Sequence, residues 1–425
     1  MEKVIIDTIA GGILPEEIKV GKDSKRFKQI RTCILISGLS VFAQLYLFQP
    51  MLSLLCRDFE ITPAMSSLAV SSTTIGMAVG LFIFAFKADA ISRQKLMSIT
   101  LFISSLLTIL SAFVGHFYVL VLINFLKGVV LSGVSAVALA YLSEEVSVAV
   151  IGLAISLYLS GNTIGGMSGR VVAILVSGWQ GWRAAAVVIG IISLLLSLIF
   201  MKKFPESKHF QPKSMSVTSK FRQMVFFIKT PLFLGMYVIA ALIMGIFVSV
   251  YNYLNFILEE PPFSLPHYVI AMIFLMYTIG VAGSVLSGKW SDKISPDFLL
   301  KGLLFLMLVG LLMLQVMHLW AVVLGLGLVT FAFFGAHTMA SRIVSQQAKE
   351  EKSSATCLYW LFYYLGSSFT GSLTGVVLFK YGWAVFMGVT IAMVIVALLV
   401  SLAVTPKLSV AYRFVHRRIY AFIRN

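Results

Sequence analysis

The stretch Ala85-Phe-Lys-Ala-Asp89-Ala-Ile-Ser92 follows one long apolar run, and Gly288-Lys-Trp-Ser-Asp292-Lys-Ile-Ser295 follows another apolar run 203 residues later. Both copies place an aspartate four residues after the first residue and a serine three residues further on. Glycines 161 and 166 recur at 366 and 371, and a Gly-Trp dipeptide follows each pair. This repetition predicts a parallel duplication of one unit, which is typical of transporters whose halves are related by an axis along the membrane normal.

Of the 425 residues, 59% are hydrophobic and 12% are charged, which leaves too little polar surface to cover a soluble chain. The composition excludes an ordinary soluble enzyme and predicts an all-α membrane protein with two pseudo-symmetric six-helix bundles. Apolar runs of about 20 residues, the length that crosses a bilayer, indicate twelve transmembrane helices. They cover residues 30–52, 64–86, 97–115, 117–141, 148–177, 182–201, 231–257, 267–287, 297–316, 319–341, 354–378 and 383–404.

The longest polar interruption, residues 202–230, separates six spans from six. We interpret it as a cytoplasmic linker between bundles at 30–201 and 231–404. Residues 1–29 lack the apolar core of a signal peptide, so we expect a retained cytoplasmic N-terminal segment. The tail 405–425 carries basic and aromatic residues in the pattern of an amphipathic helix that lies on the inner leaflet.

The placement of basic residues predicts the orientation. Of the 33 Lys and Arg residues, 28 fall on the side of the two termini, whereas Arg57, Arg183 and Lys380 fall on the other side. Basic loops stay inside, so both termini are expected in the cytoplasm.

Charges confined between apolar runs argue against a nucleic-acid partner. The three cysteines have no C-x-x-C spacing and indicate no metal site, and we expect a monomer without a cofactor.

Several strings carry a family resemblance. The loop with Asp89, Arg93 and Lys95 resembles the gate motif of the major facilitator superfamily, although Ala85 and Ser92 replace its two glycines. The strings AYLSEEV at 140–146, SGNTIGGMSGR at 160–170 and FYYLGSS at 362–368 resemble the YnfM-like branch of the drug:proton antiporter group. The resemblance covers residues 30 to 405. It implies a twelve-helix, alternating-access exporter of the bacterial inner membrane that uses the proton gradient, and it names no cargo.

Three gate residues are expected from the duplicated loops: Asp89, Arg93 and Asp292. Each aspartate would accept hydrogen bonds from helix N-termini of the opposite half and so hold the cytoplasmic side closed. The alternative for each aspartate is a solvated loop charge.

Glycines in the fifth span fall at the spacing of the antiporter signature of the superfamily, where missing side chains let helices approach closely. Gly166 stands where that signature has proline, and Arg170 where it has its last glycine. Ordinary packing of small residues is the alternative interpretation. The glycines are Gly152, Gly161, Gly165, Gly166 and Gly169.

Two cations fall inside predicted spans. Lys127 and Arg170 each lie about 14 Å from the outer end of their helix at 1.5 Å per residue. A cation at that depth costs roughly 3 kcal/mol or more unless it faces water or a partner, and all seventeen acidic residues can be placed in tails, loops or helix ends. We therefore predict a positive cavity that binds a small anionic cargo such as a carboxylate. In the alternative, Arg170 bonds to backbone carbonyls and Lys127 extends outward.

Polar residues inside spans are further candidates for substrate contact. They are Tyr46, Gln49, Asn162, Asn252 and Tyr363, with Tyr251, Asn255, Tyr359 and Tyr364 beside them. His337 is the only histidine well inside a span, and because imidazole exchanges protons near neutral pH it is the candidate for proton coupling. The alternative is a packed histidine that bonds to a carbonyl.

The function expected from these observations is export of a small anionic or amphipathic organic solute with proton coupling. Import or exchange of an anionic metabolite or a polycarboxylate siderophore is the alternative, because buried cations attract such cargo from either side. A membrane-embedded sensor or enzyme would need an output domain or a catalytic cluster, and the sequence has no Ser-His-Asp arrangement and no phosphate loop.

Overall fold

The computed structural model describes residues 20–21, 24–87, 91–208, 210, 217–348 and 352–405, which are helical apart from turns and one isolated bridge between Val20 and Val146. The first half forms α2 (Lys25–Leu45), η1 (Gln49–Met51), α3 (Leu52–Phe59), α4 (Pro63–Ser66), α5 (Leu68–Lys87), α6 (Arg93–Leu110), η3 (Ser111–Phe113), α7 (Phe117–Glu145) and α8 (Val148–Lys203). The second half forms α9 (Val217–Lys229), α10 (Pro231–Glu259), α11 (His267–Ile273), η4 (Phe274–Met276), α12 (Tyr277–Trp290), α13 (Pro296–Leu314), α14 (Leu319–Gln347) and α15 (Lys352–Val404). Asp89 and the expected tail helix lie outside the described residues.

Nine segments within the described ranges are helical, long and apolar enough to cross a membrane. Two of them, α8 and α15, are interrupted at one glycine each. Gly181 has φ 79° and Gly382 has φ 81°, a conformation that residues with a side chain rarely adopt. Each of these helices therefore comprises two spans, and α11, η4 and α12 together cover the eighth expected span. The helices agree with the predicted all-α membrane fold.

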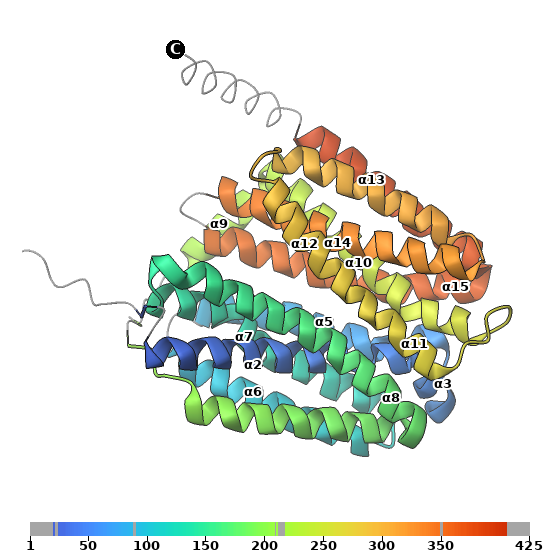
Figure 1. Cartoon of the computed structure of the whole chain (residues 1–425), viewed down its shortest axis with the longest axis horizontal. Helices are drawn as coiled ribbons and strands as arrows, with labels where there is room; N and C mark the ends of the chain where they lie inside the picture. The colour runs from blue at the N-terminus through green and yellow to red at the C-terminus, as the bar shows by residue number, and fades with distance from the viewer. Residues whose placement is uncertain are drawn as a thin grey trace, which may run out of the picture.

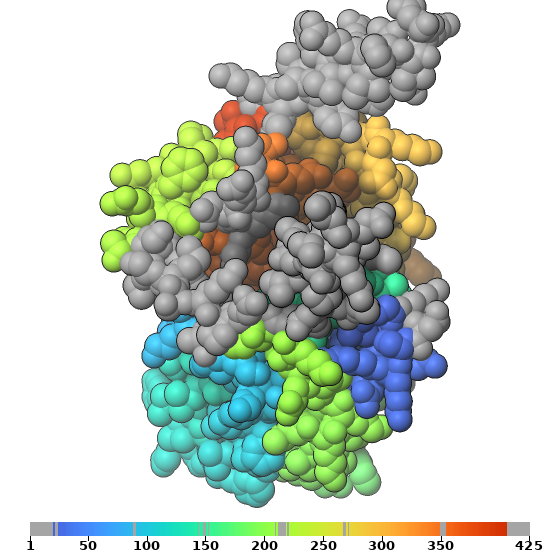
Figure 2. Space-filling model, turned by 90° about the vertical axis from the view of Figure 1, so that its left-hand side faces the viewer, coloured from blue at the N-terminus to red at the C-terminus, as the bar shows by residue number. Residues whose placement is uncertain are grey.

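The helices pack as two groups. In the first half α2 packs on α8, and α7 packs on α5 and α6; in the second half α10 packs on α15, and α14 packs on α12 and α13. Figure 1 shows the first group below, in blue to green, and the second above, in yellow to red. Figure 2 shows the same separation from the side where α2 begins. Between the groups, α5 packs along α15 and α8 packs against α11.

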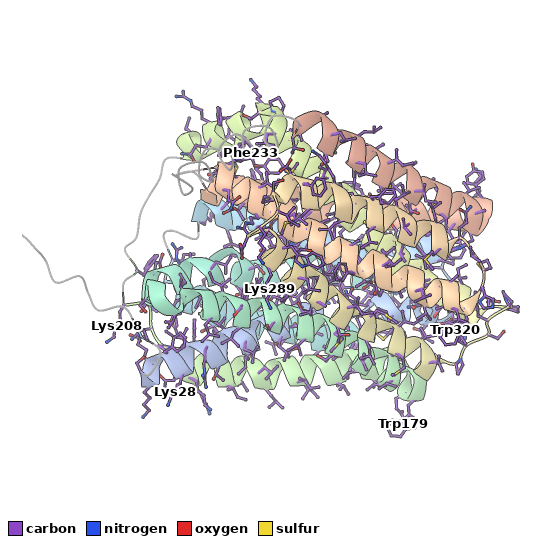
Figure 3. All side chains as sticks on the ribbon, turned by 45° about the horizontal axis from the view of Figure 1, so that its top comes forward. Lys28, Trp179, Lys208, Phe233, Lys289 and Trp320 are labelled. Atoms are coloured by element: carbon purple, nitrogen blue, oxygen red, sulfur yellow. The ribbon has the colours of Figure 1, made fainter. Side chains whose placement is uncertain are left out.

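The two ends of the bundle differ in character. Figure 3 shows Lys28 and Lys208 at one end, called the linker end, and Trp179 and Trp320 at the opposite, distal end. The two tryptophans are 83% and 71% exposed. Exposed tryptophan at the rim of an apolar bundle is typical of the boundary between membrane and water.

Glycines bring α8 against the backbone of α2. A Cβ at Gly161 would lie 2.4 Å from the carbonyl oxygen of Leu35, and a Cβ at Gly165 would lie 2.2 Å from that of Leu39. A Cβ at Gly169 would lie 2.7 Å from the Cα of Ala43 in α2. Any side chain at these positions would separate the two helices, so the glycine spacing sets how closely the first and fifth spans pack.

The linker contains a helix. Residues 217–229 form α9, which packs on α10 and α15 and so belongs with the second half. The sequence predicted a polar connection here and did not predict this element.

Candidate substrate-binding site

The first span is broken where the candidate site lies. α2 ends at Leu45, and the helix resumes only with η1 at Gln49. Pro50 lies in the first turn of η1, and because proline has no backbone N–H it favours such a break. The break brings Tyr46, Phe48 and Gln49 against the two buried cations of the first half.

Lys127, on α7, is 0% exposed. Its Nζ lies 5.1 Å from the centre of the Phe48 ring and has no hydrogen-bond acceptor within the described ranges. One turn earlier, Asn124 Nδ2 donates to the carbonyl oxygen of Ala69 at 3.0 Å, so Asn124 joins α7 to α5. Lys127 therefore does not extend outward; it is a buried cation whose ammonium group lies against an aromatic face.

Arg170, on α8, is 3% exposed. Its Nε donates to Gln49 Oε1 at 2.7 Å, and its Nη1 donates to the carbonyl oxygen of Gly166 at 2.5 Å. The guanidinium carbon lies 4.6 Å from the Tyr46 ring centre and 4.8 Å from that of Tyr277 in the second half. The arginine thus makes a hydrogen bond to a backbone carbonyl, which the sequence analysis gave as the alternative to cargo binding. It also lies where the two halves meet.

Gln49 links this arginine to the second half. Its Nε2 donates to Asn252 Oδ1 at 2.7 Å, while its Oε1 accepts from Arg170. Asn252 Nδ2 and, one turn further along α10, Asn255 Nδ2 are buried without an acceptor in the described part of the chain. Together with Lys127 Nζ, three buried donors of this region therefore lack an acceptor among the described residues, and a ligand that supplies oxygen acceptors would satisfy them.

The two halves differ in charge at equivalent positions. The 203-residue offset relates Phe48 and Lys127 to Tyr251 and Thr330, and the Tyr251 hydroxyl is hydrogen-bonded to Thr330 Oγ1 at 2.8 Å. The corresponding pair of the second half, on the seventh and tenth spans, is thus neutral. The site is positive on one side only.

Aromatic rings occupy the second half of the site. Phe247 and Phe333 are stacked with centroids 3.9 Å apart and an interplanar angle of 11°. Tyr277 lies 5.6 Å from Phe247, and Phe333 lies 6.4 Å from Tyr363. We call Phe247, Phe274, Tyr277, Phe333 and Tyr363 the aromatic cluster.

His337 borders this cluster. Its Nδ1 is 2.9 Å from the Tyr359 hydroxyl, which also donates to the His337 carbonyl oxygen at 3.2 Å. Its ring lies 4.9 Å from Tyr363 and 5.2 Å from Trp360. The imidazole is therefore bonded to one hydroxyl and lies among tilted aromatic rings.

Two other predicted residues lie within the first half. A Cβ at Gly38 would be 2.5 Å from Asn162 Oδ1, so Asn162 faces the contact between α2 and α8. It precedes Arg170 by about two turns, roughly 12 Å of helix. Gly166 differs from its neighbouring glycines because a Cβ there would be 3.1 Å from Arg170 Nη1. Gly152 lies in the first turns of α8.

The gate residues lie at the linker end. Arg93 Nη2 pairs with Glu144 at 3.1 Å, and Asp292 pairs with Arg342 at 3.4 Å. Each pair joins helices of one half, whereas the sequence predicted contacts of Asp292 with the opposite half. Asp89 lies outside the described residues.

Sequence reasoning identified Tyr46, Gln49, Asn252 and Arg170, which direct contacts connect in the structure, and Lys127, which lies against Phe48 beside Gln49. It missed Phe247, Phe274, Tyr277 and Phe333. Of these four, only Phe274 and Tyr277 show a pattern in the sequence, a separation of three residues in one predicted span, and many lipid-facing residues share it.

The comparisons agree with this architecture. The model of the Major Facilitator Superfamily matches residues 34–371. The uncharacterized MFS-type transporter YybF of Bacillus subtilis is 33% identical over 90% of this chain and 95% of its own length. The inner membrane transport protein YnfM of Escherichia coli is 33% identical over 90% of this chain and 92% of its own. The predicted relationship to the YnfM-like branch is therefore confirmed.

Two more distant similarities bear on fold and site. The benzoate transport protein of Acinetobacter baylyi is 26% identical over 62% of this chain and 64% of its own. The crystal structure of a bacterial homologue of the human lysosomal transporter Spinster, inward-facing and unoccupied, has a TM-score of 0.76 at 15% identity and covers 91% of this chain and 98% of that one. That likeness shows the fold alone. Because the family model spans most of its length, the chain belongs to the Major Facilitator Superfamily, as a multi-pass membrane transporter.

Proposed function

We propose that this transporter moves a small organic carboxylate by alternating access and exports it in exchange for protons. One observation carries the proposal: Lys127 and Arg170 are almost fully buried, and no acidic side chain in the described ranges pairs with either. A buried charge needs an opposite charge nearby, and a cargo carboxylate would supply it. The similarity to a benzoate transport protein supports a carboxylate, since benzoate belongs to that class.

Contacts between the halves support alternating access. Besides the bond from Gln49 to Asn252, Ser53 Oγ donates to Glu259 Oε1 at 3.2 Å, and Thr74 Oγ1 lies 2.6 Å from Ser368 Oγ. Ser53 lies in the first turn of α3, and Glu259 is the last residue of α10. Hydrogen bonds of this kind between two separately packed bundles can exchange with water when the bundles rock, without disrupting either core.

Proton coupling and export are the finer parts of the proposal. His337 is the coupling residue we propose, because its imidazole faces the aromatic cluster and is bonded to a hydroxyl. The close glycine contact between α2 and α8, with its resemblance to the antiporter signature, supports export. The linker end, where Lys25, Lys203 and Lys229 lie, would face the cytoplasm, and the site within one chain fits a monomer.

Flux into and out of proteoliposomes tests the proposal. Vesicles with the full chain should move labelled benzoate opposite to an imposed proton gradient and faster than protein-free vesicles, which report passive leak of the protonated acid. Lys127→Met and Arg170→Met should each reduce the protein-dependent flux at least 10-fold, about 1.4 kcal/mol of lost binding. Lys380→Met, which removes an exposed cation, is the matched control.

Each contrary outcome has a definite meaning. Unchanged flux in both cation variants would overturn the anion site. Benzoate that moves in the same direction as protons would replace export by uptake, and flux that requires a second anion on the opposite side would replace proton coupling by exchange.

A further inference from the structure

We infer that the preferred cargo is a planar aromatic monocarboxylate, whose carboxylate is bound by Lys127 and Arg170 of the first half together with Asn252 and whose ring packs on the aromatic cluster of the second half. This inference rests on the proposed function and specifies the organic anion. It follows from the way the two halves divide the chemistry of the site.

The first half and one helix of the second supply the carboxylate contacts. Arg170 has its Nε and Nη1 engaged by Gln49 and Gly166, and the fork geometry of guanidinium leaves further N–H groups for an oxygen ligand. Lys127 Nζ and Asn252 Nδ2 are buried donors without an acceptor in the described residues. A carboxylate offers two oxygens with about four acceptor positions, which suits this donor set.

The second half supplies aromatic faces next to the arginine. The Arg170 guanidinium carbon lies 4.8 Å from the Tyr277 ring centre and 5.9 Å from that of Phe274. From Tyr277 the aromatic cluster continues through Phe247, at 5.6 Å, to Phe333. A ligand whose carboxylate meets Arg170 would therefore place its body beside these rings.

An aromatic ring fits such a surface better than a saturated one of the same size. Flat rings can stack or meet edge-to-face with neighbouring rings, and this adds roughly 2- to 10-fold in affinity beyond the buried area. A puckered cyclohexyl ring buries comparable area without this contribution.

The one-sided charge limits the number of carboxylates. Thr330 stands at the position equivalent to Lys127, and the 205-residue spacing of the glycine pairs relates Arg170 to Gly375, where a Cβ would lie 2.1 Å from the Tyr253 hydroxyl. The second half thus has no cation at either equivalent position to receive a second carboxylate. This favours a monoacid with one binding orientation.

Isothermal titration of the purified full-length chain with three matched probes tests the inference. Benzoate should bind 2- to 10-fold more tightly than cyclohexanecarboxylate, which has the same charge and a saturated ring. Benzamide, which has the ring without the charge, should bind at least 10-fold more weakly than benzoate. Terephthalate, which adds a second carboxylate, should bind no more tightly than benzoate.

Two variants locate the ring. Phe333→Leu should bring the affinities for benzoate and cyclohexanecarboxylate together while both still bind, and Tyr277→Leu should do the same if Phe333→Leu does not fold. Phe379→Leu removes a 46% exposed aromatic residue of α15 outside the aromatic cluster and should keep the wild-type ratio.

The outcomes separate this inference from the proposed function. Equal binding of benzoate and cyclohexanecarboxylate by the wild-type chain would overturn the aromatic preference and leave the carboxylate transporter standing. Tighter binding of terephthalate would overturn the single-carboxylate assignment. Failure of every carboxylate to bind would overturn both.

Discussion

The side-chain amide of Gln49 donates to Asn252 at 2.7 Å, and these two residues are separated by 203 positions, the offset of the duplicated loops. The bond therefore joins equivalent positions of the first and seventh spans, across the axis that relates the halves. Gln49 also accepts from Arg170. A change in the distance between the halves would thus alter the hydrogen bond from Gln49 to Asn252. Through the same side chain it would also alter the hydrogen bond from Arg170 to Gln49.

Replacing this amide by a carboxylate should weaken anion binding. In Gln49→Glu, a carboxylate 2.7 Å from Arg170 Nε would satisfy the arginine from within the protein, so we expect benzoate affinity to fall at least 10-fold. Gln49→Leu removes the same hydrogen bonds without adding charge and should weaken binding less. Equal losses in the two variants, measured by titration calorimetry, would show that charge is not what the cargo recognises.

Two glycine substitutions should differ in their effect on thermal stability. A Cβ at Gly165 would lie 2.2 Å from the Leu39 carbonyl oxygen, so Gly165→Ala should destabilise the packing of α8 on α2 by about 1–3 kcal/mol. Gly388 has nothing within 4 Å of its Cβ position, and Gly388→Ala should be neutral or stabilise by up to about 1 kcal/mol through helix propensity. Unfolding temperatures in one detergent measure both. A stable Gly165→Ala would contradict the close helix contact.

A cross-link should stop transport reversibly. The hydroxyl oxygens of Thr74 and Ser368 lie 2.6 Å apart in different halves, so cysteines at both positions should form a disulfide under mild oxidation. We expect the oxidised double variant, made without the native cysteines, to lose flux and to regain it after reduction. The two single-cysteine variants control for the substitutions. Full flux in the cross-linked protein would argue against movement between the halves.

Labelling of intact cells tests the orientation. In a cysteine-free chain, Trp179→Cys at the distal end should react with a membrane-impermeant maleimide added outside. Lys208→Cys at the linker end should react only after the cells are opened. The reverse pattern would place the linker end outside and invert the proposed topology.

The sequence predicted the fold because its signals are local. Apolar runs, charge between them and the Gly-Trp turns at 181 and 382 each depend on neighbouring residues only, and the structure forms helices and turns at these places. The two cations were found for the same reason, since a charge within an apolar run is visible without knowing its neighbours.

What escaped prediction depends on tertiary contacts. Phe247 and Phe333 are two of 33 phenylalanines, and only the folded chain shows that they are buried and stacked on each other, next to the Tyr277 ring that lies against Arg170. The partner of Asp292 could not be inferred either, because Arg342 lies 50 residues later in a different helix. The Gln49–Asn252 bond was accessible in principle, since both residues were candidates and the offset was known.

The two buried cations of the first half give the empty carrier an electrical property. A carrier that holds two positive charges with no acidic partner in the described part of the chain would experience the membrane voltage when it rocks, by up to about 2.3 kcal/mol per charge for each 100 mV that the charge crosses. A bound monoanion cancels one of these charges. Voltage would therefore act more strongly on the return of the unloaded carrier than on the step that moves cargo. The membrane potential would then control the turnover rate through this unloaded return step.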